Sequence, residues 1–292
     1  MSSTAQSEAH NRARPLRAQV ARRLLKSPHF ISGFVLFSVI VIAAVFAPQL
    51  SPADPYFQDY GAVLLPPGSE GHPLGTDGFG RDVMSRVLYG ARISLLVGLS
   101  SVLLGLVAGV SLGVVAGYFP ALDRPLMSLV DILIAFPGIL LAIAIVAALG
   151  AGLTNVVVAV AIFSVPTFAR ISRGAVLNIR EAEYVTAAKA VGSRDARIVF
   201  RAILPNILSP LIVYSSLRLA TSILTAATLS FLGLGAQPPT PEWGALISEG
   251  RTYVYNARYL SVVPGVAIFI TVLAFNLLGD SLRDALDPKS LG

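Results

Sequence analysis

Six long apolar runs constrain this chain more than any other feature of its sequence. They cover residues 31–50, 93–118, 126–149, 154–171, 207–233 and 259–280. A helix of about 20 apolar residues crosses a hydrocarbon core about 30 Å thick, because each residue adds about 1.5 Å. The runs therefore predict an all-α integral membrane protein with six transmembrane helices.

Composition supports a lipid environment and excludes several kinds of chemistry. Hydrophobic residues make up 54% of the 292-residue chain and charged residues only 13%, against about 25% charged residues in a soluble domain. Cysteine is absent, which excludes disulfides, thiolate metal sites and thiol nucleophiles. The three histidines, His10, His29 and His72, lie far apart and outside the apolar runs. We therefore expect no catalytic residue and no metal site in this chain.

The distribution of positive charge predicts the orientation in the membrane. With the N-terminus in the cytoplasm, 16 of the 22 Lys and Arg residues lie on the cytoplasmic side, five on the other side and one, Arg218, within an apolar run. Cytoplasmic loops of membrane proteins carry such an excess of positive charge. Both termini are therefore expected to face the cytoplasm. The net charge of +6 is attributed to topology, and no nucleic-acid partner is expected.

The apolar runs divide the chain into four parts. A cytoplasmic tail (1–30) precedes a first transmembrane helix (31–50), whose apolar run is longer than the ~7–15 residues of a signal peptide. A Pro- and Gly-rich extracytoplasmic connector (51–92) follows. Residues 93–290 then form a core of five helices, which contains a long cytoplasmic loop at 170–206.

The cytoplasmic loop carries a helical pattern interrupted by a glycine. Apolar side chains recur at helical spacing from Tyr184 to Val191, and the pattern resumes after Gly192 until Pro205 stops it. This spacing predicts two short amphipathic helices hinged at the glycine. From the residues alone, the two helices either lie at the headgroup boundary or dock onto a partner.

A resemblance to a known family favours docking. The run Thr186-Ala187-Ala188-Lys189-Ala190-Val191-Gly192, followed by Ile203-Leu204-Pro205, resembles the EAA loop of permease subunits in ABC importers, with Thr186 in place of the leading Glu. In that family the loop forms a coupling helix that seats in a groove of a cytoplasmic ATPase. The resemblance implies ATPase contacts at Tyr184, Thr186, Ala187, Ala188, Lys189, Val191, Gly192, Arg194, Asp195, Leu204 and Pro205.

Three further segments are similar to one subfamily, the C-type permeases of dipeptide, oligopeptide and nickel importers. They are 72–82, 229–244 and 275–284, in the family's order. The resemblance implies a type I ABC importer permease fold in a bacterial inner membrane, and a peptide importer, with nickel, glutathione or haem as alternative solutes. It also implies a homologous second permease, two ATP-binding subunits and an extracytoplasmic solute-binding protein. Since no Gly-Lys pair occurs in the sequence, a P-loop is excluded, and ATP and Mg are expected on the partner ATPases.

Glycines and prolines mark the spans that pack closely or bend. Gly105, Gly109, Gly113 and Gly117 recur every four residues and form one small-residue face of a helix. This face is expected to pack against another helix, either of this chain or of a sister permease. Pro137, Pro166, Pro210 and Pro264 are expected to interrupt backbone hydrogen bonding in the spans.

Two charged residues within the apolar runs need a partner or a cavity, because an intramembrane charge is costly. We expect Asp131 and Arg218 either to pair with each other, to pair with a sister subunit or to line the translocation path. In the extracytoplasmic loop, Glu242 and Trp243 are candidates for contact with the binding protein, although interfacial aromatic residues also form belts at the membrane surface. An ion-gradient-driven transporter is the main alternative, but it favours inverted repeats and mid-membrane carboxylates, which the sequence does not show.

Overall fold

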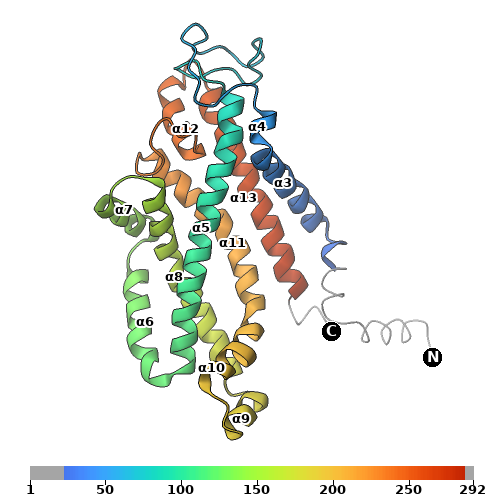
Figure 1. Cartoon of the computed structure of the whole chain (residues 1–292), viewed down its shortest axis with the longest axis vertical. Helices are drawn as coiled ribbons and strands as arrows, with labels where there is room; N and C mark the ends of the chain where they lie inside the picture. The colour runs from blue at the N-terminus through green and yellow to red at the C-terminus, as the bar shows by residue number, and fades with distance from the viewer. Residues whose placement is uncertain (1–22, 287–292) are drawn as a thin grey trace, which may run out of the picture.

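The computed structural model describes residues 23–286 as an elongated bundle of helices (Figure 1). Within this range there is no β-strand, only two isolated β-bridges in the connector. The helices, in chain order, are α3 (Pro28–Val45), α4 (Ala47–Leu50), α5 (Val83–Tyr118), α6 (Pro120–Ala135), α7 (Gly138–Leu149), α8 (Leu153–Ile179), α9 (Glu183–Ala190), α10 (Asp195–Ile198), a π-helical turn (Val199–Ile203), α11 (Leu204–Phe231), α12 (Trp243–Gly250), a 3₁₀ turn (Arg251–Tyr253) and α13 (Tyr259–Leu286).

Five helical segments are long and apolar enough to cross a membrane, and a bent helix pair brings the number to the six predicted from the sequence only if its two halves form one span. The five are α3, α5, α8, the stretch Asp195–Phe231 and α13. The sixth, predicted as one continuous run at 126–149, consists of α6 and α7, which meet at an angle of 93°. Two parts of the prediction lie outside the described residues. They are residues 1–22 of the predicted tail and residues 287–290 of the predicted core.

Proline explains the break between α6 and α7. Phe136 has φ −89° and ψ 137°, an extended conformation, which is the one that a following proline favours. Pro137 has no N–H to continue the helical hydrogen bonds. The other three prolines in the spans, Pro166, Pro210 and Pro264, lie inside α8, α11 and α13 without ending them.

Helices α5 and α8 extend beyond the apolar runs that predicted them. Helix α5 begins at Val83 instead of 93, where the Asp82 side chain accepts a hydrogen bond from Ser85 N–H. Its 36 residues span about 54 Å at about 1.5 Å per residue, which is longer than the hydrocarbon core. The apolar run therefore marks the membrane-embedded part of the helix, and polar turns continue it beyond the bilayer.

The glycine face of α5 packs against α8 of the same chain. A Cβ atom added at Gly109 would lie 2.5 Å from Phe168 Cβ, and one added at Gly117 would lie 2.8 Å from Val176 Cβ. Such distances are far inside van der Waals contact, so the two backbones approach closely only because the side chains are absent. Of the two alternatives left open by the sequence, the structure shows packing within the chain.

The remaining spans arrange themselves around this pair. Helix α3 lies along α13 at the edge of the bundle (Figure 1), where Gly33 sits close to Leu277. Only 17% of the apolar window of α3 is buried, less than in α5, α8 or α13, so α3 is peripheral. The connector and α12 lie at one end of the bundle and α9 and α10 at the other (Figure 1).

Candidate functional site

The predicted helix, glycine, helix arrangement is present at the α9–α10 end. Helix α9 ends in a Schellman motif, in which Ser193 N–H donates to Ala188 O and Gly192 N–H to Lys189 O. Gly192 has a φ of +77°, a left-handed conformation that glycine adopts without steric cost. The chain then turns sharply into α10. We call residues 183–203 the coupling unit.

One face of the coupling unit is fused to the bundle. Val185 and Ile203 have no exposed surface and Ile198 is 2% exposed. All three pack in one apolar cluster with Phe168 and Val176 of α8. The sequence pattern did not identify Val185 as a buried residue, because it took the neighbouring Tyr184 as the apolar position of the helix. The coupling unit is therefore anchored to one end of the bundle of membrane helices.

The opposite face projects apolar and basic side chains into solvent. Tyr184 is 49% exposed, Val191 81% and Phe200 67%. Beside them, Gly192, Arg194, Arg197 and Arg201 help to line a groove of about 590 Å³. Exposed apolar side chains next to unpaired cations are typical of a surface that another protein covers. The predicted contact residues Thr186, Ala187 and Lys189 lie on α9, Asp195 opens α10, and Leu204 and Pro205 open α11.

Asp131 and Arg218 do not pair with each other, so that part of the prediction is wrong. Asp131 on α6 forms an ion pair with Arg170 on α8, with 2.6 Å between Oδ1 and Nη2. Arg170 had been assigned to the cytoplasmic loop, but α8 continues past it to Ile179. Because α6 runs along α8, Arg170 lies within reach of Asp131. A second ion pair joins the same two helices nearer the end of α8, where Arg173 contacts Asp123 at 2.5 Å.

Arg218 is instead held by α8. Its Nε donates to Ser164 Oγ at 3.0 Å and its Nη2 to the Phe163 carbonyl at 3.3 Å. The guanidinium group also lies 4.2 Å from the centroid of the Phe163 ring, a favourable cation–π distance. These contacts compensate the charge of a side chain on a residue that is only 9% exposed. Its predicted role in lining the translocation path stays a prediction.

Glu242 and Trp243 are buried in this conformation, so neither side chain is presented to a partner here, and their contact with a binding protein stays a prediction. Each is 2% exposed. Glu242 caps α12 by accepting a hydrogen bond from Ala245 N–H at 3.0 Å, and the Ser94 hydroxyl donates to its other oxygen at 3.1 Å. The Trp243 indole N–H donates to Val87 O at 3.0 Å. Both side chains therefore fasten α12 to α5 and are covered in this conformation.

Burial also determines the protonation behaviour of Glu242. Loss of solvent raises the pKa of its carboxyl above the usual value, and hydrogen bonds from the backbone of Gly244 and Ala245 and from the hydroxyls of Ser230 and Ser94 lower it by less. The indole of Trp243 fits beside it because Gly90 leaves the space, since a Cβ there would lie 2.8 Å from Trp243 Cδ1.

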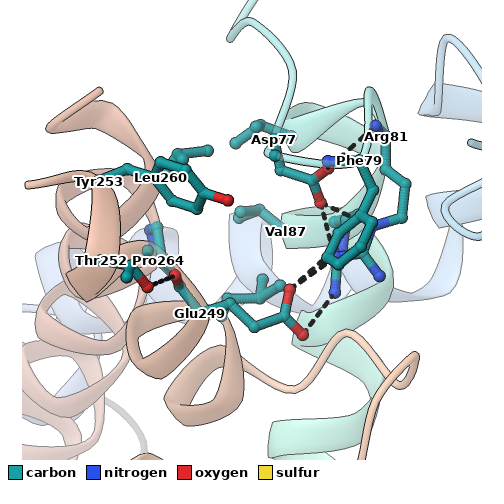
Figure 2. A pocket seen from close by; sticks show the side chains of 14 residues that line it. Asp77, Phe79, Arg81, Val87, Glu249, Thr252, Tyr253, Leu260 and Pro264 are labelled. Atoms are coloured by element: carbon teal, nitrogen blue, oxygen red, sulfur yellow. Dashed lines mark hydrogen bonds and ion pairs between the residues drawn. The ribbon is translucent and has the colours of Figure 1, made fainter. Parts of the chain in front are cut away.

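The connector is tied to α12 by a cluster of four charged residues that the sequence reading did not identify as a site (Figure 2). Arg81 Nε contacts Asp77 at 2.7 Å, and Arg81 Nη2 contacts Glu249 at 2.7 Å. Arg86 contacts both carboxylates, at 3.0 Å from Glu249. The side chains of Arg81 and Arg86 are only 3% and 2% exposed. The four groups line a pocket of about 260 Å³ and neutralise one another, which favours a structural lock over a ligand site.

An apolar groove of about 800 Å³ runs between α5, α11 and the π-helical turn. Aliphatic side chains dominate its lining, and the three serines in it, Ser111, Ser215 and Ser216, donate their hydroxyls to carbonyls of their own helices. The three serine hydroxyls are thus already satisfied, and Asp195 adds a carboxylate at the end of the groove. Among the described residues, no group of His, Cys, Asp or Glu side chains is arranged to hold a metal ion.

Comparisons with known families match most of the chain. Residues 101–291 match the family described as "Binding-protein-dependent transport system inner membrane component". Residues 16–67 match the "N-terminal TM domain of oligopeptide transport permease C". Among solved structures, the chain is similar to inward-facing conformations of the MetNI methionine ABC transporter, with a TM-score of 0.58 and 23% identity over 70% of this chain and 98% of that one. This similarity supports the importer permease fold.

Curated relatives are similar over nearly their whole length. The glutathione transport system permease protein GsiD of Pectobacterium atrosepticum is 52% identical over 272 residues, which cover 92% of this chain and 89% of the relative. The di/tripeptide transport system permease protein DppC of Pseudomonas aeruginosa is 48% identical over 265 residues, 89% of this chain and 88% of the relative. With these matches and its membrane-spanning helices, the chain belongs to the family of inner membrane components of binding-protein-dependent transport systems, as a multi-pass transport permease subunit of the ABC importer type.

Proposed function

We propose that this chain forms half of the translocation pathway of an ATP-driven importer of small peptides. The similarity to relatives named for di/tripeptide and glutathione transport supports this solute class, because glutathione is itself a tripeptide. Glutathione is the second candidate, favoured by the 52% identity to GsiD. Related importers for nickel or haem are less well supported, since no relative described above is named for them.

The observation that carries the proposal is the solvent-facing side of the coupling unit. The helix pair and its glycine turn expose Tyr184 and Val191 at the end of the bundle opposite the connector, and the following π-helical turn exposes Phe200. We infer that this face seats in a groove of an ATPase subunit, because removing exposed apolar side chains of this size from water stabilises a complex. Movement of the ATPase would then move the membrane helices to which the coupling unit is fused.

The chain needs partners to perform this function. We infer that ATP and Mg are bound by two separate ATP-binding subunits, since the sequence contains no P-loop. A homologous permease would supply the other half of the pathway, and an extracytoplasmic binding protein would deliver the solute to the connector end. The family description, which names binding-protein dependence, supports the last of these. The excess of Lys and Arg at the α9–α10 end supports a cytoplasmic location for both termini in a bacterial inner membrane.

The basic groove suggests the chemistry of the ATPase surface. Arg194, Arg197 and Arg201 line the same groove as Gly192, and none of them forms an ion pair within residues 23–286. We infer that the receiving surface of the ATPase carries Asp or Glu side chains. Docking would then weaken as salt is raised, because screening acts most strongly on exposed charge pairs.

Site-specific crosslinking tests the proposal directly, because the chain has no cysteine of its own. A Val191→Cys variant, in the assembled complex, is expected to crosslink to an ATPase subunit, and a Tyr255→Cys variant is not. Tyr255 is 89% exposed on the segment between α12 and α13 and serves as the matched control. Crosslinking of Tyr255→Cys to the ATPase, or of neither variant, would contradict the proposed docking.

Uptake by reconstituted vesicles separates the two energy sources. Vesicles that contain the permease pair, the ATPases and the binding protein are expected to accumulate dipeptides only with internal ATP and Mg. Uptake by this chain alone, driven by an ion gradient, would instead support the secondary transporter. Competition between dipeptides and glutathione in the same vesicles determines the preferred solute.

A further inference from the structure

Tyr118 contacts both sides of the glycine turn in the coupling unit. It is the last residue of α5 and is 6% exposed. Its hydroxyl donates a hydrogen bond to Asp195 Oδ1 at 2.6 Å, and Asp195 is the first residue of α10. The Nζ atom of Lys189, near the end of α9, lies 5.1 Å from the centroid of the Tyr118 ring. A single side chain thus connects α5 with the end of α9 and the start of α10.

The surroundings of Tyr118 keep its ring in place. It packs in the apolar cluster that contains Val185, Ile198 and Phe168. Next to it, Arg180 Nη1, just after α8, donates to the Gly117 carbonyl at 3.1 Å. The ends of α5 and α8 are therefore joined at the level of Tyr118. The hydroxyl is held at a defined position relative to the two membrane helices.

The contacts have a mechanical consequence. Because Gly192 has no Cβ, its backbone dihedrals are restricted less than those of other residues, and contacts from outside the turn help to fix the angle between α9 and α10. The charge-assisted hydrogen bond to Asp195 and the cation–π contact with Lys189 restrain this angle from a point outside the turn. A displacement of the coupling unit is then carried to α5, and to α8 through the glycine face.

We propose that Tyr118 is a positioning residue that transmits displacement of the coupling unit to α5, so that ATP hydrolysis is coupled to solute passage. The proposal rests on the proposed function, because the displacing force comes from a docked ATPase. It assigns to Tyr118 a role in coupling efficiency and none in solute binding or ATP hydrolysis.

The test compares ATP hydrolysed with solute transported by the assembled complex in vesicles. Tyr118→Phe keeps the ring, and with it the cation–π contact and the packing, but removes the hydrogen bond. ATP hydrolysis is expected to stay within about twofold of the original protein, while the ATP consumed per solute rises about fivefold, the lower end of typical coupling effects. Tyr255→Phe removes a hydroxyl at the opposite end and is expected to leave the ratio unchanged.

A second variant keeps the proposal falsifiable if Tyr118→Phe fails to assemble. Asp195→Ala removes the same hydrogen bond from an exposed position, and it is expected to raise the ratio to the same extent. The double variant should be no worse than either single one, because both remove one interaction. An unchanged ratio in Tyr118→Phe, or in Asp195→Ala alone if only that variant assembles, overturns the proposal, as do additive effects. Failure of the proposed function itself is distinguishable, because the original complex would then show no ATP-dependent uptake.

Discussion

The two ends of the bundle differ in how their arginine side chains are placed. At the connector end, Arg81 and Arg86 are buried and paired with Asp77 and Glu249, and the large aromatic residue Trp243 is covered. At the α9–α10 end, arginines line an open groove, and Val191 and Phe200 face solvent. The difference teaches that charge and aromatic content alone do not mark an interaction surface. The connector end pairs its arginines internally while Tyr60 and Tyr255 stay exposed, whereas the α9–α10 end leaves its arginines exposed as well.

The largest expected effect tests whether the connector end is a structural lock. Replacing Arg86 with Ala leaves Asp77 and Glu249 with one cation fewer in a buried site, and breaking a buried ion pair costs about 3–5 kcal/mol. Unfolding in detergent, followed by the fluorescence of Trp243, the single tryptophan, measures the loss. The matched control is Arg92→Ala, on an exposed part of α5, with an expected change below about 1 kcal/mol. Equal effects of the two variants would contradict the lock.

The next effect concerns the helices that join the two ends. Gly109→Ala forces a Cβ to within 2.5 Å of Phe168 Cβ, and overpacking of this kind costs about 1–3 kcal/mol. Gly174→Ala on α8 is the control, because no atom lies within 4 Å of its added Cβ and alanine favours a helix by up to about 1 kcal/mol. Opposite signs of the two changes in unfolding free energy are expected. A neutral Gly109→Ala would argue against close packing of α5 on α8.

A smaller effect distinguishes ATPase binding from folding stability at the α9–α10 end. Val191→Ala changes a side chain that is 81% exposed, so the unfolding free energy should change by less than about 0.5 kcal/mol. Its affinity for the ATPase subunits should nevertheless fall by about 1 kcal/mol, roughly fivefold. Copurification titrated with ATPase measures this, with Val254→Ala at the other end as the control. A loss of stability without a loss of binding would remove the contrast between the ends.

The smallest effect is a difference in pH dependence at Glu242. Because burial raises the pKa of this carboxyl in the folded state, the folded protein holds the proton to higher pH than the unfolded chain does. The group therefore lowers stability as the pH rises above its ordinary value of 4.5, and it has no effect well below that value. Glu242→Gln keeps hydrogen-bonding groups toward Ser94 and Ala245 and should remove this part of the pH slope. Parallel slopes for both proteins in thermal unfolding would contradict the raised pKa.

The sequence was informative where the controlling interaction is local. The five long spanning helices follow from apolar length, because lipid satisfies no backbone group and forces a helix. The turn at Gly192 follows from a glycine within a helical pattern. The charged partners could not be predicted in this way. Arg81 and Glu249 are 168 positions apart in the sequence, and Arg170 was read as a loop residue because it lies at the end of an apolar run. Trp243 resembled an interfacial aromatic residue, but the space left by Gly90 and the carbonyl of Val87 allow its burial.

The break at Pro137 leaves two helical pieces that are each shorter than a hydrocarbon layer. At about 1.5 Å per residue, the 16 residues of α6 and the 12 residues of α7 reach only about 24 and 18 Å. Neither piece matches a hydrocarbon layer of about 30 Å by itself, so lipids facing this side must compress, unless another subunit covers it. For a pair that forms one bent crossing, transport is expected to respond to acyl-chain length, with shorter chains relieving the mismatch.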